Sequence, residues 1–314
     1  MMALNNQIAN SPAEKERREK ERSELINMLR DVCVHIVHSQ DGARLTMNAI
    51  WYGTTKDRKA IIKSFKTFVP KIAKEEFGYM VLLVILDCVD DTKLTEKAIL
   101  GELTVNNDVI EEIISDDRAR KVLLFAMTGK NKTYFHPDVI SHLNEGNGNP
   151  NSKKDADLRR KEVADALTKP LINYISENLD RFLSTNNLII FLQGVLLNCA
   201  EDNLGKLVDQ LAKKIVQPFT PNDGVNLIES PAVHMFTKKI LAKNEFYSKL
   251  LTSFDPETLK KCLSCNRGAY LFVAMTELNS EAKAQVEIAL KPHLKYLKVE
   301  CSSKGADLLQ KKLE

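Results

Sequence analysis

Lysine and arginine side chains that could bind phosphate groups gather between residues 56 and 74, where seven basic residues accompany one acid, Asp57. Lys59, Lys63 and Lys66 are four and three residues apart, so a helix would place them on one face. Like charges one turn apart repel by roughly a few tenths of a kcal/mol per pair. A bound polyanion would relieve that repulsion, through contacts that weaken with salt and read little sequence. The competing interpretation is a solvated face that keeps the protein soluble.

Further basic clusters recur along the chain, at residues 118–121, on the segment 153–161 and at scattered later positions. A phosphate-binding surface distributed along an elongated protein would show this pattern, as would a lysine-rich protein without a partner. The net charge of +3 is too small to decide between them. The candidate nucleic-acid-binding residues are Arg44, Lys56, Arg58, Lys59, Lys63, Lys66, Arg118, Arg120, Lys121, Lys153, Lys154, Arg159, Arg160 and Lys161.

Catalytic and metal-binding patterns are weak in this sequence. It contains no GxSxG, HExxH or GxxxxGK[ST] motif. His35 and His38 have Asp31 as their only local acid, which favours packed or solvent-facing histidines over a metal site. The acids in the segment 87–91 fit helix capping better than acid–base chemistry. We therefore predict no catalytic residues, no metal and no cofactor, and a protein that is not an enzyme and has no small-molecule substrate.

The elements that would position these side chains are helices. Apolar residues recur at i, i+3 and i+4 nearly everywhere, as in Leu25-Ile26-Leu29 and Ile61-Ile62-Phe65. No 18-residue apolar run is present, so we predict no transmembrane helix and no membrane partner. The six cysteines are scattered through helical patterns, which indicates a reducing compartment. The predicted fold class is all-α.

A degenerate repeat organises the helices. Polar residues precede a small residue and an apolar helix, and the small residue recurs 35 to 44 residues apart except across one 69-residue gap. A unit of this length cannot close a core alone, whereas stacked neighbours can. This spacing predicts a helical solenoid. The small-residue positions are Ala43, Gly78, Ala119, Leu188 (a degenerate copy), Ala232, Gly268 and Gly305.

The domain organisation follows from the long gap and from charge. Residues 1–24 interleave acids and bases without an apolar signal core, which indicates a solvated helix or a flexible lead-in. Repeats are predicted over residues 25–141 and 163–314. Between them, residues 142–162 combine a Gly/Asn/Pro-rich loop with basic residues and are interpreted as a basic insertion.

Several motifs in order resemble a known family: DGARLTMNAIWYGTTKDRKAIIKSFKTFVPKIA, LDCVDDTKL, RKVLLFAM and GNGNPNSKKDADLRRKE. From about Leu25 to the end, the sequence resembles the C-terminal, CPL/Penguin-like half of the Puf-A/Penguin proteins, the divergent nucleolar branch of the pumilio (PUF) repeat family. The resemblance implies a PUF/armadillo-like α-helical solenoid. Family members have further repeats before this part, so the chain would be a fragment, a short isoform or a diverged gene product.

The same resemblance implies function. It implies binding to structured or double-stranded RNA (an rRNA precursor or an mRNA) and to DNA through basic surfaces. It also implies pre-ribosomal protein partners, a nuclear and nucleolar location, a role in large-subunit ribosome assembly, and a related role in translational regulation.

Base reading is a separate question, because ordinary PUF repeats read one base with two or three side chains of one helix. In the first repeat these slots hold Arg44, Leu45 and Asn48, and later slots are mostly aliphatic. Aliphatic side chains form no hydrogen bonds with a base, so we predict binding without sequence specificity.

The alternative is a HEAT/armadillo-type protein–protein scaffold without nucleic-acid binding, with exposed apolar and mixed-charge residues on its concave face.

Overall fold

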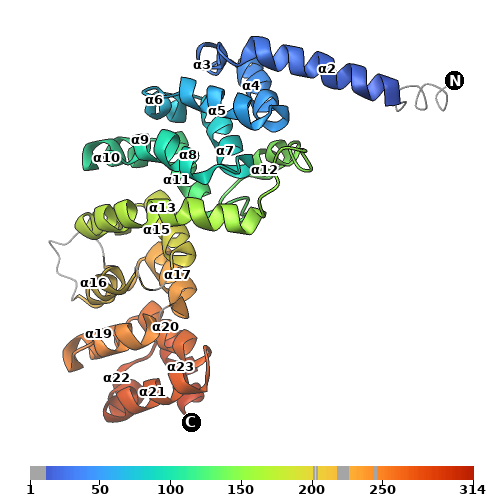
Figure 1. The fold of residues 1–314 in the computed structure, drawn as a ribbon. Helices are drawn as coiled ribbons and strands as arrows, with labels where there is room; N and C mark the ends of the chain where they lie inside the picture. The colour runs from blue at the N-terminus through green and yellow to red at the C-terminus, as the bar shows by residue number, and fades with distance from the viewer. Residues whose placement is uncertain (1–11, 201, 203, 218–225, 244–245) are drawn as a thin grey trace. The chain divides into compact units, whose positions relative to one another are not determined.

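The computed structural model describes residues 12–200, 202, 204–217, 226–243 and 246–314. Throughout these residues the regular structure is helical, without strands (Figure 1). The chain divides into two compact units, unit 1 (Met1–Leu167) and unit 2 (Thr168–Glu314), and the division falls within helix α13 (Ala156–Glu177). The predicted all-α repeat architecture is confirmed.

Unit 1 is built from rows of packed helices. The helices of the inner row contact one another in chain order; they are α4 (Gln40–Tyr52), α7 (Gly78–Cys88) and α11 (Asp117–Thr128). A short helix precedes each of them and forms a middle row of α3 (Cys33–Ile36), α6 (Val69–Lys74) and α10 (Asn107–Ser115). The outer segments that follow α4 and α7 are α5 (Thr55–Ser64) and the run α8 (Thr92–Thr95), η1 (Glu96–Leu100) and α9 (Gly101–Leu103). Helices α2 (Pro12–Leu29) and α12 (Pro137–Asn144) complete the unit.

Unit 2 repeats the same plan. Its inner helices also contact one another in order and are α15 (Asn186–Asn198), α17 (Pro231–Ile240), α20 (Asn266–Thr276) and α23 (Lys304–Leu313). The outer row consists of α16 (Gly205–Val216), α18 (Phe246–Thr252) and α21 (Ser280–Leu290). The short helices beside the inner row are α14 (Leu179–Ser184), α19 (Pro256–Ser264) and α22 (Leu294–Glu300), and η5 (Lys291–His293) leads into α22.

A recurring side-chain cap begins four of the inner helices, α4, α11, α17 and α23, whereas α7, α15 and α20 have no side-chain cap hydrogen bond. Ser39, Asp116, Ser230 and Ser303 have extended backbones, and each side chain accepts a hydrogen bond from the backbone N–H three residues later. The extended residue breaks the short helix, and its side chain satisfies an N–H that the new helix leaves free. In these four repeats the polar residue before the inner helix is therefore its cap.

The small residue of the repeat avoids a collision at that turn. A Cβ at Gly42 would lie 1.9 Å from the Ile36 carbonyl oxygen, and one at Gly268 would lie 2.1 Å from that of Cys262. In both cases the carbonyl is six residues earlier, at the end of the short helix. In the first repeat the residue that must be small is therefore Gly42, one before the predicted Ala43. At the predicted position Gly305 a Cβ would lie 2.5 Å from the Asn266 carbonyl oxygen, so a small residue is needed there.

Two segments of the predicted domain organisation contain helices. Residues 12–24 belong to the α-helix α2, the helical one of the two alternatives for the lead-in, while residues 1–11 lie outside the described part of the chain. The predicted insertion 142–162 is partly helical: α12 continues to Asn144 and α13 begins at Ala156. Among the described helices, none has the length and apolar character needed to cross a membrane.

Candidate nucleic-acid interface

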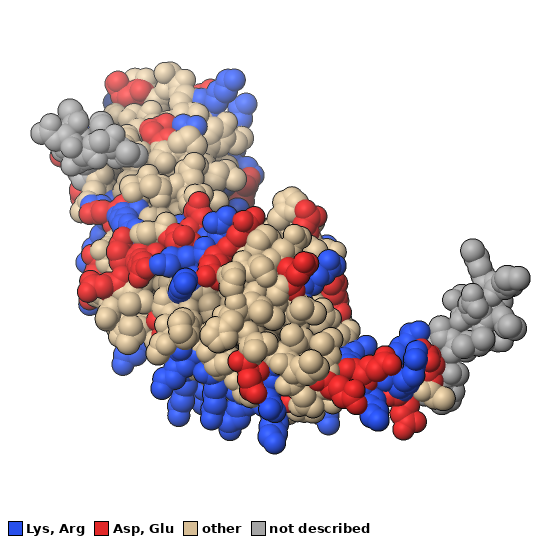
Figure 2. Space-filling model, turned by 90° about the horizontal axis from the view of Figure 1, so that it is seen from above, with Lys and Arg blue, Asp and Glu red and all other residues tan. Residues whose placement is uncertain are grey.

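The lysine face of α5 is the clearest basic surface of unit 1. Lys56, Lys59, Lys63 and Lys66 are all exposed, and none of them has an ion pair within the described structure. Figure 2, which looks onto the end of the molecule that carries α2 and α5 in Figure 1, shows Lys and Arg side chains side by side along one edge with few acids between them. Lys56, Lys59 and Lys63 lie on α5, and Lys66 lies in the turn that follows it. We call these four residues the α5 lysine face.

The local sequence explains why α5 presents this face. Thr54 and Asp57 form a reciprocal capping box in which the Asp57 carboxylate accepts from the Thr54 backbone N–H at 3.0 Å and from its hydroxyl at 2.6 Å. On the opposite side, Ile61, Ile62 and Phe65 are fully buried. The only acid of the stretch is thereby turned into the cap, and burial of the apolar side leaves the lysines in solvent.

The turn after α5 is held by a carboxylate. Thr67 adopts φ 71°, a left-handed conformation that is costly for a β-branched residue. Its backbone N–H donates to both carboxylate oxygens of Glu102, at 2.7 and 2.8 Å. The charged acceptor therefore stabilises a strained turn directly after Lys66.

Arg58 is not part of the surface, contrary to the prediction. Its side chain is only 3% exposed, and burial lowers the pKa of the guanidinium. The guanidinium donates to the backbone carbonyls of Ile50 at 2.7 Å, Trp51 at 2.9 Å and Cys88 at 3.1 Å. The capped helix start places Arg58 between the C-terminal ends of α4 and α7, where unpaired carbonyl groups need donors. Its role is structural.

The same guanidinium holds part of the predicted insertion. It donates to the Asn149 side-chain oxygen at 2.8 Å, the Asn151 carbonyl at 3.0 Å and the Ser152 hydroxyl at 3.2 Å. Upstream, Gly146 lies on the Trp51 indole, where a Cβ would be 2.1 Å from Nε1. Residues 146–152 are therefore packed against the ends of α4 and α7.

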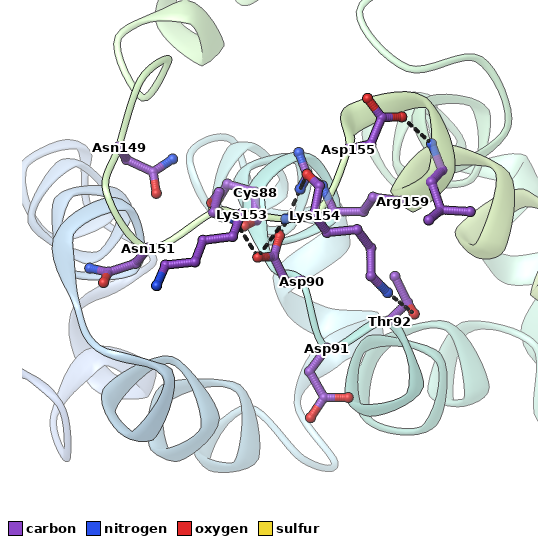
Figure 3. Close-up of polar contacts among 12 residues, drawn as sticks. Cys88, Asp90, Asp91, Thr92, Asn149, Asn151, Lys153, Lys154, Asp155 and Arg159 are labelled. Carbon is purple, nitrogen blue, oxygen red and sulfur yellow. Dashed lines mark hydrogen bonds and ion pairs between the residues drawn. The ribbon is translucent and has the colours of Figure 1, made fainter.

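Asp90 fixes the other end of the insertion. Its carboxylate accepts from the backbone N–H of Lys153 at 2.5 Å, from that of Lys154 at 3.0 Å and from Arg159 Nη1 at 2.8 Å (Figure 3). Burial raises the pKa of Asp90, but the two N–H groups and Arg159 outweigh it and hold the pKa below its usual value. The sequence interpretation of Asp90 as a cap missed this long-range contact.

Several other predicted basic residues already have partners. Arg159, at 7% exposure, is buried against Asp90, which corrects its assignment to the surface. Lys154 pairs with Glu162 at 2.6 Å, and Arg120 donates to the Ile114 carbonyl at 2.7 Å and pairs with Asp117. Arg160 pairs weakly with Asp157. The predicted residues that are exposed without an ion pair in the described structure are Arg44, Lys56, Lys59, Lys63, Lys66, Arg118, Lys121, Lys153 and Lys161.

Two further exposed lysines belong to this region but not to the predicted set. Lys71 lies on α6, directly after the α5 lysine face along the chain, and Lys97 lies on η1, which packs against α5. Lys97 directly follows Glu96 in a segment of mixed charge, so sequence clustering gave no signal for it. Lys71 was visible in the basic stretch.

We expect Asp90→Asn to loosen the insertion without unfolding unit 1. The amide would lose the charge-assisted acceptor of two N–H groups and Arg159, which costs about 1–3 kcal/mol. Amide hydrogen exchange at Lys153 and Lys154 should accelerate by about tenfold or more. Asp91→Asn is the matched control, because Asp91 is exposed and caps α8, a role that Asn fills equally well. Equal exchange rates in the two variants would contradict the anchoring role of Asp90.

The inner helices offer little to read a base. The position five residues after each cap points outward, and in unit 1 it holds Arg44 and Lys121 on α4 and α11. In later repeats the slot that corresponds to Asn48 holds Leu83, Leu124 and Gln193, and these side chains are buried. A buried side chain cannot contact a base edge.

The described residues also contain no group of three or more His, Cys, Asp or Glu residues placed to hold a metal ion.

Comparison with known proteins agrees with this architecture. The CPL (NUC119) domain model matches residues 115–250. Pumilio homolog 3 of Danio rerio is 33% identical over 309 residues, which cover 94% of this chain and 48% of that protein. Protein penguin of Drosophila melanogaster is 28% identical over 200 residues, which cover 64% of this chain and 26% of that protein. The chain spans about half the length of the Pumilio homolog 3 proteins it matches.

Solved structures show the same relationship. The crystal structure of human Puf-A superimposes with a TM-score of 0.82 at 30% identity and covers 94% of this chain and 59% of that one. Human Puf-A in complex with DNA gives a TM-score of 0.81 at 29% identity and covers 93% of this chain and 58% of that one. The chain therefore belongs with the Puf-A, Pumilio homolog 3 and Penguin proteins of the pumilio-repeat family, corresponds to about half of the Pumilio homolog 3 sequences, and contains their CPL domain.

Proposed function

We propose that unit 1 binds nucleic acid through phosphate contacts, with structured or double-stranded RNA as the main ligand and DNA as a second one. The observation that carries the proposal is the α5 lysine face, four exposed lysines that no acid of the described structure neutralises. Lysine is a flexible point charge that suits phosphate oxygens and does not select a base. Human Puf-A, which shares this fold, has been crystallised with DNA.

The binding is expected to be insensitive to base sequence. Specific reading needs hydrogen-bonding or stacking side chains at the outward positions of the inner helices. In unit 1 two of these positions carry the cations Arg44 and Lys121, and the third, Met80 on α7, has no hydrogen-bonding donor. Cations at these positions would add contacts with the phosphate backbone of the nucleic acid. Such contacts make binding depend on salt and do not select a base.

The cellular role we propose is in the nucleolus, in assembly of the large ribosomal subunit and processing of its RNA, with pre-ribosomal proteins as further partners. This part rests on the resemblance to the nucleolar branch of the family and on binding to a structured RNA. A role in translational regulation through mRNA uses the same surface. Immunofluorescence with a nucleolar marker and measurement of pre-rRNA intermediates after depletion would test this role, and a normal precursor profile would contradict it.

A salt titration tests the binding proposal. Fluorescence anisotropy with a labelled RNA duplex of about 16 base pairs should give a log–log slope of affinity against salt of roughly −3 to −4, because four phosphate contacts each contribute about −0.9. Duplexes of scrambled sequence should bind with similar affinity. A single-stranded RNA of the same length serves as the comparison for structure.

The opposite result is equally informative. Weak binding with a flat response to salt would contradict the phosphate-contact mechanism. It would favour the scaffold alternative, in which the repeats bind protein alone. Strong preference for one duplex sequence would instead contradict the absence of base reading.

A further inference from the structure

The inner helices of unit 2 expose a row of apolar side chains at one repeated position. Ile190, Met235, Tyr270 and Leu308 each lie five residues after the cap of their helix, on α15, α17, α20 and α23. The exposed fractions are 46% for Ile190, 55% for Met235 and 36% for Leu308, and Tyr270 is half-buried. Consecutive inner helices pack against one another (Figure 1), so the four side chains form a line across the helices. We call it the apolar row.

A single exposed apolar side chain needs no explanation. Recurrence at the same position of four adjacent helices does, because solvent-exposed positions are under no packing constraint to stay apolar. Two of the three equivalent positions in unit 1 hold the cations Arg44 and Lys121, and the third holds Met80, so the fold itself tolerates cations there. The apolar character of the row in unit 2 therefore points to a ligand with apolar groups of its own.

Cations border the apolar row on one side. Lys238 and Lys311 lie one helical turn after Met235 and Leu308, both are exposed, and neither has an ion pair in the described part of unit 2. Burial lowers the pKa of His234, and the positive charges of Lys238 and Arg267 lower it further against the opposing charge of Glu229. Glu229 is itself paired with Arg267 at 3.5 Å. Lys238 and Lys311 thus place exposed cations at the border of the row, where they would attract acidic groups, and the one exposed acid of α23 is Asp307, four residues before Lys311.

We propose that the apolar row binds an extended, acidic segment of a partner protein that carries an apolar side chain at every third residue. Neighbouring helices pack about 8–10 Å apart, and an extended chain in the polyproline II conformation advances about 3.1 Å per residue with three residues per turn, so every third side chain lies on the same side. Three residues of the segment therefore span one helix, and about 10 residues span the row. The intervening acids would face Lys238 and Lys311.

A protein segment fits this surface better than a nucleic acid does. Bases are held without sequence preference by stacking on flat side chains such as Tyr or Arg. Of the four side chains in the row, only Tyr270 is flat, and the others are the aliphatic Ile190, Met235 and Leu308. Aliphatic side chains bury other aliphatic groups well, at about 25 cal/mol per Å² of apolar area. The proposal does not depend on nucleic-acid binding by unit 1.

The probe is a fluorescent peptide of four Leu residues separated by Asp-Glu pairs, Leu-Asp-Glu-Leu-Asp-Glu-Leu-Asp-Glu-Leu, titrated with the full chain. We expect saturable binding that the Met235→Glu/Leu308→Glu double variant weakens by about tenfold or more, because each change removes an apolar contact and adds repulsion. The Lys238→Glu/Lys311→Glu variant should also weaken binding and reduce its salt dependence. This second variant leaves the apolar row intact, so it keeps the test valid if the first misfolds.

Controls separate this site from non-specific adhesion. Ile288 is an apolar residue that is 73% exposed, but it lies on the outer helix α21 and not in the apolar row. The Ile288→Glu variant should therefore bind the peptide with the same affinity as the unmodified protein. A peptide of the same composition with its leucines in one block should bind at least about tenfold more weakly, because its leucines no longer match the helix spacing. Equal binding of both peptides, or equal loss in the Ile288→Glu control, would overturn the proposal. So would oligouridine binding that depends on Met235 and Leu308 while the peptide does not bind.

Discussion

Charge reversal of Lys59, Lys63 and Lys66 to Glu is expected to weaken binding of duplex RNA on the order of 100-fold at about 0.1 M salt. Each lysine contributes about 1 kcal/mol through a phosphate contact, and each glutamate adds repulsion. The log–log salt slope should become shallower by about three, one for each lost cation. All three side chains are exposed, so thermal stability should stay nearly unchanged.

A matched variant controls for net charge. Lys283→Glu/Lys291→Glu/Lys295→Glu also reverses three exposed lysines, on α21, η5 and α22 of unit 2. Both triple variants change the net charge from +3 to −3. If long-range attraction alone governs binding, the two variants lose affinity equally, and that result would contradict a local site on the α5 lysine face. A loss confined to the α5 variant supports the site.

Arg58→Ala should lower the stability of unit 1 by about 3 kcal/mol or more. The substitution leaves the buried carbonyls of Ile50, Trp51 and Cys88 without their donor. An unsatisfied buried group costs about 1–3 kcal/mol. Arg58→Lys should recover only part of this loss, because an ammonium group has three donors and cannot reproduce the planar fork. Urea denaturation followed by hydrogen exchange would assign the loss to unit 1.

The control for this prediction is another arginine of the same unit. Arg44 is exposed on α4 and has no ion pair in the described structure, so Arg44→Ala should change stability by no more than about 0.5 kcal/mol. Duplex binding of Arg58→Ala at a temperature where it remains folded should show the unmodified salt slope. A stability equal to that of Arg44→Ala would mean that the buried hydrogen bonds of Arg58 do not hold unit 1 together.

Helical periodicity and the repeat spacing were sufficient to predict the fold, because both reflect local rules. Apolar residues at i, i+3 and i+4 indicate the buried side of each helix, and the recurring polar residues are caps. The same local rule predicted Lys59 and Lys63 on the exposed side of a helix opposite the buried Ile61, and both are exposed on α5. Lys66 is also exposed, but it lies in the turn after α5. The position of the small residue was harder, because the collision with a carbonyl six residues earlier is visible only in three dimensions.

The buried cations could not be predicted in this way. Arg58 lies within a run of exposed lysines, and only the ends of α4 and α7 explain why it turns inward. Arg159 similarly lies beside Arg160 and Lys161 in the sequence but meets Asp90, 69 residues away. Charge clustering identifies where cations gather, while long-range acceptors decide which of them reach solvent.

The Arg58 contacts have a consequence for how unit 1 folds. In a solenoid each repeat touches its neighbours, so end repeats can fray independently and folding can begin at any repeat. Arg58 instead joins Asn151 and Asn149 across 93 and 91 residues, which bypasses the intervening repeat. Such contacts raise the mean sequence separation between contacting residues. Folding is therefore expected to be slower than in a solenoid whose contacts are all between neighbouring repeats. In return, the first repeats and the insertion should open together as one cooperative unit.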